Sequence, residues 1–315
     1  MPEVAATVPA TPDHYSEIDV SDWPNAGDET LGTKPKKWLR DPESGERWLM
    51  KYVTNNRNAA GTEYPKGDDW SERVANGVAL RLGIPAAHTQ LAVQRDGGSK
   101  YFGIISREVL APHDSRGRKR EELIAGNELL PHPLTGRSRT GYTLAAVKVA
   151  LVGVDPAIAA PEGLTAWDVF AGYLVLDALV GNTDRHQENW AVIAGTDSLR
   201  LAPTFDHASS LGFLLSDDAR FQRLKTSDSG FTPEAYADRA TSPFESRPHP
   251  IALASEALRM CESHVRDTWM SGCEDADYLV EPVSLVPADR MSEPARQFAE
   301  RVMRRNCDRL LQESH

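Results

Sequence analysis

Apolar and polar positions alternate along the first hundred residues in the manner of β-strands. The runs KKWLR and RWLMKYV flank a turn signal at Asp41-Pro42-Glu43-Ser44-Gly45, which predicts a β-hairpin over residues 36–53. The stretch HTQLAVQRDGGSKYFGIISREV predicts two further strands around Asp96-Gly97-Gly98. We interpret the polar, Gly-containing segment 55–70 as a loop, and the Pro-rich residues 1–28 as a loose leader.

One helix interrupts these strands, and its apolar residues recur at every fourth position. Val74, Val78 and Leu82 form an i, i+4, i+8 stripe, which is typical of an amphipathic helix. Ser71 precedes the stripe and is the expected N-cap. The first part of the chain is therefore expected to be a β-rich lobe over residues 29–110 with a single helix.

Helical periodicity dominates the remaining residues, 111–315. TLAAVKVALVGV and LTAWDVFAGYLVLDALVG predict helices, the second with Thr165 as N-cap, and EPARQFAERVMRRNCDRLLQE predicts a C-terminal helix. Two short strand-like runs, WAVIAG and LRLAPTF, lie between them. A β-rich lobe followed by an α-rich lobe predicts an α+β fold, with a ligand-binding cleft between the lobes.

Composition narrows the function classes. The net charge is −11, from 35 basic and 46 acidic residues, which argues against direct binding to nucleic acid or to an anionic membrane. Asp168 and Asp177 interrupt the most apolar tract, so we interpret it as a buried helix and not a membrane span. Three widely spaced cysteines predict reduced thiols in a cytoplasmic protein.

Four residues with the chemistry of phosphoryl transfer follow one another along the chain. Lys51 lies in a predicted strand, Asp184 and Asn189 have the spacing D-x-x-x-x-N after a buried helix, and Asp206 ends the later strand PTFD. Carboxylate and amide oxygens are ligands that suit Mg²⁺. Each residue alone has an ordinary explanation, as a strand lysine that reaches solvent or as a turn former, and only their order favours a site.

The segment GNTDRHQEN, followed by a short hairpin and PTFD, resembles the catalytic segment of the HipA-like serine/threonine protein kinases, relatives of the phosphatidylinositol 3/4-kinases. The similarity extends upstream through ERWLMKY, WSERVANGVALRLGIPAA and YFGIISREVL. It implies a two-lobed protein-kinase-like fold that binds ATP and Mg²⁺, with a catalytic loop over residues 181–190 and a metal-binding segment over residues 203–212. The Gly-rich phosphate loop of ordinary protein kinases is missing from the sequence.

The resemblance also assigns roles to individual residues. It implies that Asp184 is the catalytic base, that Asn189 and Asp206 bind Mg²⁺, and that Lys51 contacts the phosphates of ATP. Main-chain groups near Arg107, Glu108 and Val109 would meet the adenine. His186 is a further catalytic candidate that either contacts the γ-phosphate or only stabilises the loop.

Several alternatives remain open at this stage. Glu72 and Glu63 compete as the partner of Lys51, and His186 with His207 and a carboxylate could instead form a zinc site. His207 is otherwise taken as incidental. A basic loop is interpreted as a solvated surface or a substrate-docking patch; its residues are Arg116, Arg118, Lys119 and Arg120.

The acceptor is the least constrained part of the prediction. A protein serine or threonine is expected, with autophosphorylation in the 30–33 or 54–62 segments as an additional reaction. A small-molecule or lipid kinase and a non-catalytic nucleotide-binding regulator are the alternatives. The resemblance also implies an antitoxin-type protein partner that binds DNA, whereas this chain is not expected to bind DNA directly.

Overall fold

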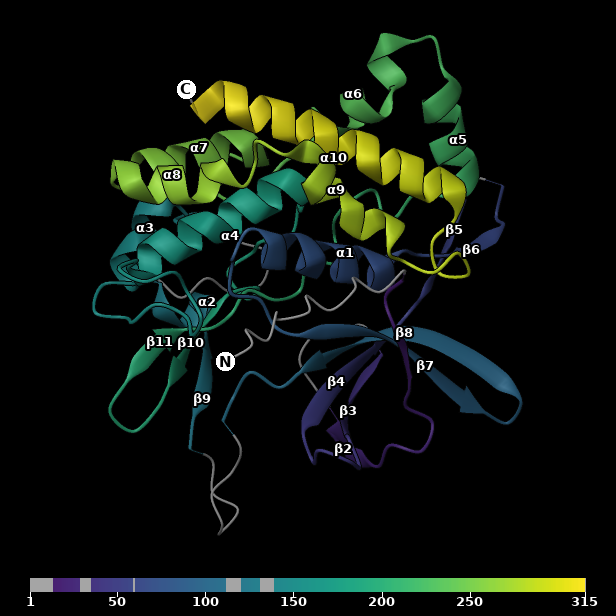
Figure 1. Ribbon diagram of the computed structural model, residues 1–315, viewed down its shortest axis with the longest axis horizontal. Helices are drawn as coiled ribbons and strands as arrows, with labels where there is room; N and C mark the ends of the chain where they lie inside the picture. Colours follow the sequence, from purple (N-terminus) through teal and green to yellow (C-terminus); the bar gives the residue numbers. More distant parts are fainter. Residues whose placement is uncertain (1–13, 29–34, 59, 112–119, 131–138, 315) are drawn as a thin grey trace, which may run out of the picture.

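The computed structural model describes residues 14–28, 35–58, 60–111, 120–130 and 139–314. Two sheets lie below a layer of helices in Figure 1. The larger has the order β1-β7-β8-β4-β3-β2 and the smaller the order β11-β10-β9, while β5 and β6 pair by themselves. The strands are β1 (Glu17–Asp19), β2 (Asn25–Asp28), β3 (Lys36–Arg40), β4 (Arg47–Tyr52), β5 (Asn55–Arg57), β6 (Glu63–Pro65), β7 (Thr89–Asp96), β8 (Ser99–Arg107), β9 (Glu122–Ala125), β10 (Ala191–Ala194) and β11 (Leu199–Leu201).

The helices follow mainly after residue 125, as the sequence predicts. The exception is α1, which packs between the larger sheet and helices α4 and α9 (Figure 1). The helices are α1 (Asp68–Arg81), α2 (Gly126–Leu129), α3 (Leu144–Ala150), α4 (Ala166–Val180), α5 (Asp217–Lys225), α6 (Pro233–Ala237), α7 (Pro250–Arg259), α8 (Ser263–Ser271), α9 (Ala276–Ser284) and α10 (Glu293–Ser314). The predicted α+β class, with a β-rich part followed by a largely helical part, is confirmed.

Both predicted hairpins of the larger sheet are present. β3 pairs antiparallel with β4, and β7 with β8, each across the predicted turn. β4 also pairs with β8, which sets Lys51 opposite Ile104 in the middle of the sheet. Lys51 is thus held by strands on both sides, and its side chain is only 19% exposed. A central strand fixes the position of this lysine far better than an edge strand would.

The sequence prediction was wrong at two places in this part of the chain. The leader was predicted to be loose through residue 28, but β1 pairs in parallel with β7 and β2 pairs with β3. The segment 55–70 was predicted to be a loop, but it contains the β5–β6 hairpin and the start of α1. These strands have three or four residues each, too short for alternation to be recognised in the sequence.

The predicted start of α1 was also wrong. The helix begins at Asp68 with Gly67 as its N-cap, four residues before the predicted N-cap Ser71, which lies buried inside the helix. The Gly67 N–H donates to the Phe213 carbonyl at 2.9 Å, and the Ser71 Oγ donates to the Ser210 carbonyl at 3.0 Å. Tertiary contacts with a distant segment, and not a local cap, therefore set this end of the helix.

α4 is the central buried helix and leads directly into the predicted catalytic loop. Thr165 forms a capping box with Asp168, which confirms the predicted N-cap. All thirteen apolar and glycine residues between Ala166 and Val180 are buried, so the helix is packed on every side. Gly181 ends the helix with φ +63°. The left-handed conformation of this glycine turns the chain sharply into the loop at Asn182.

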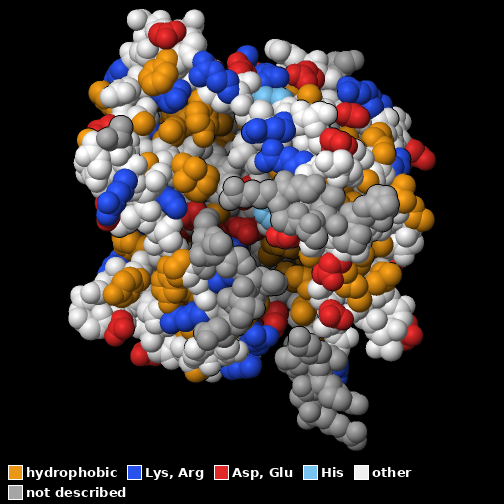
Figure 2. Space-filling view, turned by 180° about the vertical axis from the view of Figure 1, so that it is seen from behind, with side chains coloured by type: hydrophobic (Ala, Val, Ile, Leu, Met, Phe, Trp, Pro, Cys, Tyr) orange, Lys and Arg blue, Asp and Glu red, His pale blue; other side chains and the backbone are white. Residues whose placement is uncertain are grey.

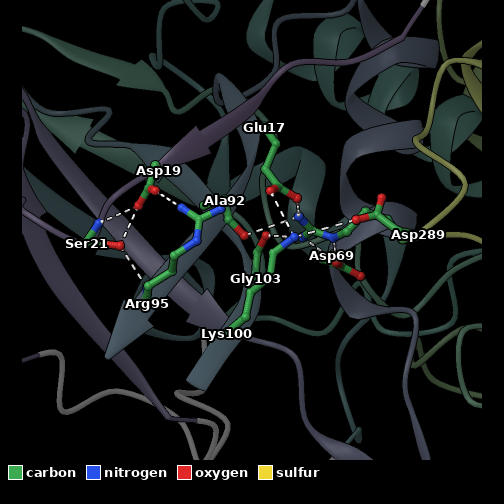
Figure 3. Close-up of polar contacts among 10 residues, drawn as sticks. Glu17, Asp19, Ser21, Asp69, Ala92, Arg95, Lys100, Gly103 and Asp289 are labelled. Carbon is green, nitrogen blue, oxygen red and sulfur yellow. Dashed lines mark hydrogen bonds and ion pairs between the residues drawn. The ribbon is translucent and has the colours of Figure 1, made fainter. Parts of the chain in front are cut away.

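Arg290, in the segment between α9 and α10, ties the helical part to the larger sheet. Its guanidinium is fully buried and donates to Asp69 of α1 at 2.6 and 3.0 Å and to Glu17 of β1 at 2.6 Å. It also donates to the carbonyls of Ala92 and Gly103 at 3.3 and 2.7 Å. In Figure 3 the labelled Glu17 and Asp69 side chains reach the same region from different elements. One side chain thereby fixes α1 against β7 and β8.

Candidate functional site

Lys51 and Asp206 meet at the centre of the proposed site, although 155 positions separate them. The Lys51 Nζ donates to Asp206 Oδ1 at 2.9 Å, which joins β4 to the segment that follows β11. Burial alone would lower the pKa of Lys51, but the carboxylates of Asp206 and Glu72 outweigh it and raise that pKa above its ordinary value. The lysine is therefore a stable cation over the neutral pH range.

Asp184 and Asn189 lie together in the loop after α4. The Asn189 Nδ2 donates to the Asp184 carbonyl at 2.6 Å, and the Asp184 N–H donates to Asn182 Oδ1 at 3.0 Å. The Asp184 carboxylate is about half exposed and accepts from Ser209 Oγ at 3.3 Å. Because the side-chain amide nitrogen of Asn189 is bound within the loop, the side-chain amide oxygen is the atom that can coordinate a cation.

The loop is joined to the 203–212 segment by contacts at several points. Besides the Ser209 contact, the Thr183 N–H donates to the Ser209 carbonyl at 3.3 Å, and the Leu211 N–H donates to the Val180 carbonyl at 3.0 Å. The structure thus brings all four predicted residues into one connected region: Lys51, Asp184, Asn189 and Asp206. Figure 2 shows acidic side chains beside a histidine in the middle of one face, at the border of the grey atoms.

Arg185 organises this region, and the sequence analysis gave it no role. Its side chain is 1% exposed and forms a two-point ion pair with Asp177 of α4 at 2.8 and 2.9 Å. It also donates to the carbonyls of Asn189 at 2.5 Å and Phe205 at 3.3 Å. Burial would lower the pKa of Arg185, but the Asp177 carboxylate outweighs it and raises the pKa. Asp177 lies inside an apolar helix, and a buried carboxylate needs a cation beside it. This requirement could have indicated a role for Arg185 from the sequence alone.

His186 stabilises the loop and also faces the Asp184 carboxylate. Its Nδ1 accepts from the Glu188 N–H at 3.1 Å, and its Nε2 lies 3.9 Å from Asp184 Oδ1. Because Nδ1 is an acceptor, the neutral ring carries its hydrogen on Nε2, the nitrogen that faces Asp184. The contact with Glu188 supports a role in loop structure, and its catalytic role stays a prediction.

The partner of Glu72 is His207, whose ring has two buried contacts that the sequence does not indicate. His207 is 1% exposed; its Nδ1 lies 3.2 Å from Glu72 Oε1, and its Nε2 lies 2.8 Å from Thr204 Oγ1. Burial would raise the pKa of Glu72, but His207 and then Lys51 outweigh it and lower the pKa. Of the two candidate glutamates, Glu63 pairs with Arg57 at the surface, so Glu72 is the one near Lys51.

The predicted adenine-contacting residues lie just after β8. The Glu108 N–H donates to the Arg47 carbonyl at 2.9 Å, and the Glu108 carboxylate forms an ion pair with the Arg47 guanidinium. Val109 packs, like Phe205, against a small apolar cluster formed by Ala191, Ile193 and Ala202. Val109 therefore lies against the strands that lead to Asp206, whereas the Glu108 side chain has an ionic partner on β4. Nucleotide contact by either residue stays a prediction.

The residues present suit a magnesium ion better than a zinc ion. An amide oxygen from Asn189 and a carboxylate from Asp206 are the few protein ligands that Mg²⁺ takes when phosphates and water supply the rest. Among the described residues, no three His, Cys, Asp or Glu side chains form a metal-binding group, and His207 is buried against Glu72 and Thr204. The zinc alternative therefore has no ligand set within these residues.

Two cavities of the described part of the chain are lined by none of Lys51, Asp184, Asn189 and Asp206, although the second borders the predicted adenine-contacting residues. One, of about 380 Å³, lies between the β5–β6 hairpin, α5 and Arg290, and the other, of about 470 Å³, is lined by Arg47, Arg107 and Glu108. Of the predicted basic loop, Arg120 is exposed, and Arg116, Arg118 and Lys119 lie outside the described residues. No helix in the described ranges is long and apolar enough to span a membrane.

Comparison with known proteins identifies the fold. No protein-family model matches the chain, and no curated protein matches it by sequence. Among solved structures, it is similar to the Helicobacter pylori proinflammatory kinase CtkA, with a TM-score of 0.68, 16% identity, and coverage of 95% of this chain and 97% of that one. It is also similar to HipA of the Shewanella oneidensis HipA–HipB toxin–antitoxin system, with a TM-score of 0.55, 13% identity, and coverage of 92% and 66%. The chain therefore has a HipA-like, protein-kinase-like fold.

Proposed function

We propose that the protein is an ATP- and Mg²⁺-dependent phosphotransferase that transfers the γ-phosphoryl group to a protein serine or threonine hydroxyl. The observation that carries the proposal is the contact between Lys51 of β4 and Asp206, beside a loop that joins Asp184 and Asn189 to the same segment. A kinase-like fold alone would not imply activity. The presence of a cation, a base and two oxygen ligands in one region favours a working enzyme.

Asp184 and Lys51 have separate roles in the proposed reaction. The acceptor hydroxyl forms a bond to the γ-phosphorus while the bond to the β–γ bridging oxygen breaks, and ADP leaves with that electron pair. Asp184, half exposed and oriented by Ser209, accepts the hydroxyl proton. Lys51 leaves Asp206 and neutralises charge on the phosphates, since a lysine that remains protonated is suited to that task.

Asn189 and Asp206 would hold Mg²⁺, which supplies charge neutralisation at the phosphates when it is bound. In its absence Lys51 provides the positive charge next to Asp206, so the two carboxylates of Asp206 and Glu72 are not left without a cation. Arg185 keeps Asn189 and the 205–206 backbone at a fixed separation by binding both carbonyls. Geometry of this kind contributes most when it is set before the substrate binds.

The protein serine or threonine acceptor is part of the proposal, and it has two alternatives. A small-molecule or lipid hydroxyl would use the same residues, and a non-catalytic nucleotide-binding protein would need no base, yet Asp184 is present. Autophosphorylation in segment 54–62 stays a prediction, and segment 30–33 lies outside the described residues. The antitoxin-type partner also stays a prediction; HipB and operator DNA are named only for the Shewanella oneidensis complex.

The test is phosphoryl transfer from [γ-³²P]ATP to proteins of a cell lysate, compared with transfer to a panel of small hydroxyl compounds. We expect labelled protein with wild type and labelling reduced by about 10²-fold or more with Asp184→Asn or Asp206→Asn. Asp197→Asn, at an exposed turn between β10 and β11, is the matched control and should label like wild type. Equal labelling by all four proteins would refute the assignment, and label only in the small compounds would favour the alternative acceptor.

A further inference from the structure

Asp206 has a backbone conformation that the surrounding structure must enforce. Its φ is +60°, in the left-handed region that residues other than glycine seldom adopt. Such a conformation persists only where neighbouring contacts hold it. The residues on each side of Asp206 are therefore the place to look for what fixes its carboxylate.

The segment before Asp206 is fixed through its backbone. The Thr204 N–H donates to the Pro85 carbonyl and the Ala87 N–H donates to the Thr204 carbonyl, both at 2.9 Å. These bonds form a short parallel bridge between Ala86 and Thr204, which joins the segment to the chain that connects α1 to β7. The position of Thr204 relative to the larger sheet is thus set independently of any ligand.

The segment after Asp206 is fixed through the side chain of His207. Both ring nitrogens have partners: Nδ1 faces Glu72 of α1 at 3.2 Å, and Nε2 faces Thr204 at 2.8 Å. The ring is 1% exposed and Glu72 is 4% exposed, so water does not replace either contact. Since Lys51 also binds Asp206 from β4, the residue is held from three directions.

We propose that His207 is a positioning residue for the metal-binding carboxylate, because its contact with Glu72 fixes the orientation of Asp206 relative to α1 and Lys51. This inference rests on the proposed function, since it concerns the Mg²⁺ ligand. His207 itself does not touch the nucleotide or the metal. Its effect on nucleotide binding is therefore confined to the part that depends on Mg²⁺.

Two amide substitutions separate the two ring contacts. In Asn, the side-chain amide nitrogen occupies the position of Nδ1, so His207→Asn keeps a donor toward Glu72 and loses the Thr204 contact. In Gln, the amide nitrogen occupies the position of Nε2, so His207→Gln keeps the Thr204 contact and loses Glu72. The two variants thus form a matched pair of similar polarity that differ in which partner they retain.

The experiment measures ATP binding by isothermal titration calorimetry with and without MgCl₂, together with thermal unfolding of the ligand-free proteins. We expect His207→Gln to reduce the Mg²⁺-dependent gain in ATP affinity by about 10-fold or more, the range for loss of a residue that orients a metal ligand. ATP affinity without Mg²⁺ should stay unchanged, and His207→Asn should stay close to wild type.

Each other outcome has a definite meaning. If His207→Gln lowers the unfolding temperature but retains the full Mg²⁺-dependent gain, the residue is only structural and the inference is wrong. An equal loss in His207→Asn and His207→Gln would show that the Glu72 contact is not the cause. If wild type itself binds ATP with no dependence on Mg²⁺, the proposed function fails, and that failure is visible before any variant is compared.

Discussion

Replacing Arg185 by methionine tests how much this arginine stabilises the loop over residues 181–190. The substitution keeps a long side chain of similar reach but removes four hydrogen bonds, two to Asp177 and one each to the carbonyls of Asn189 and Phe205. Asp177 is 3% exposed, so its carboxylate cannot gain water in compensation. Its remaining side-chain donor is Asn182, at 2.8 Å.

The size of the effect follows from this burial. Removing one partner of a buried ion pair costs about 3–5 kcal/mol, because the other charge is left without compensation. A typical domain has an unfolding free energy of about 5–15 kcal/mol, so Arg185→Met should lower stability by a large fraction of the total. Arg185→Lys keeps the charge but loses the two-point geometry, and we expect a smaller cost of about 1–3 kcal/mol.

The assay is urea unfolding followed by tryptophan fluorescence, for which the chain has seven tryptophans. The double variant Asp177→Asn/Arg185→Met removes both charges and should be less destabilised than the sum of its single variants by about 1–3 kcal/mol. The reasoning would be refuted if Arg185→Met unfolded within about 0.5 kcal/mol of wild type, the range for surface substitutions. If the free-energy changes of the two single variants simply add up to that of the double variant, the coupling between Asp177 and Arg185 would be contradicted.

Three further predictions rest on separate features of the structure. Lys51→Met should be less stable than wild type at neutral pH; because the pKa of Lys51 is raised, the difference is fully present below the ordinary value of 10.5 and is lost as the pH rises through the raised pKa in alkaline unfolding titrations. Gly126→Ala should lower the unfolding free energy by about 1–3 kcal/mol, since the added Cβ would clash with the buried ring of Trp190. Burial raises the pKa of Cys273 to about 12 and that of Cys307 to about 11, so both thiols should be inert to a thiol reagent at pH 8 until urea is added; rapid reaction of the native protein would contradict this.

The features that could be predicted from the sequence are those whose cause is local. Thr165 and Asp168 form their capping box within one helical turn, and the turn at Asp96-Gly97-Gly98 needs only its own glycines. The spacing of Asp184 and Asn189 is likewise visible because one loop carries both residues. For these elements the local pattern and the final fold agree.

The features that were missed depend on distant partners. α1 begins at Asp68 because Gly67 binds the Phe213 carbonyl and Arg290 binds Asp69, contacts that no local window contains. The sequence does not indicate the contact of His207 because its partner, Glu72, lies 135 positions earlier in the chain. The short strands β1 and β2 are stabilised by pairing with longer neighbours more than by their own sequence.

The most direct test of the proposed kinase activity compares ATP labelled at the γ-phosphate with ATP labelled at the α-phosphate. Wild-type protein is incubated with Mg²⁺ and its acceptor pool, with either [γ-³²P]ATP or [α-³²P]ATP, and the radioactivity transferred to protein is measured. The account predicts transfer from the γ-labelled nucleotide alone and its loss in Asp184→Asn. Transfer from the α-labelled nucleotide and not from the γ-labelled one would indicate that an adenylyl group is moved while pyrophosphate leaves, and transfer from neither, to protein or small acceptor, would contradict the proposed kinase activity.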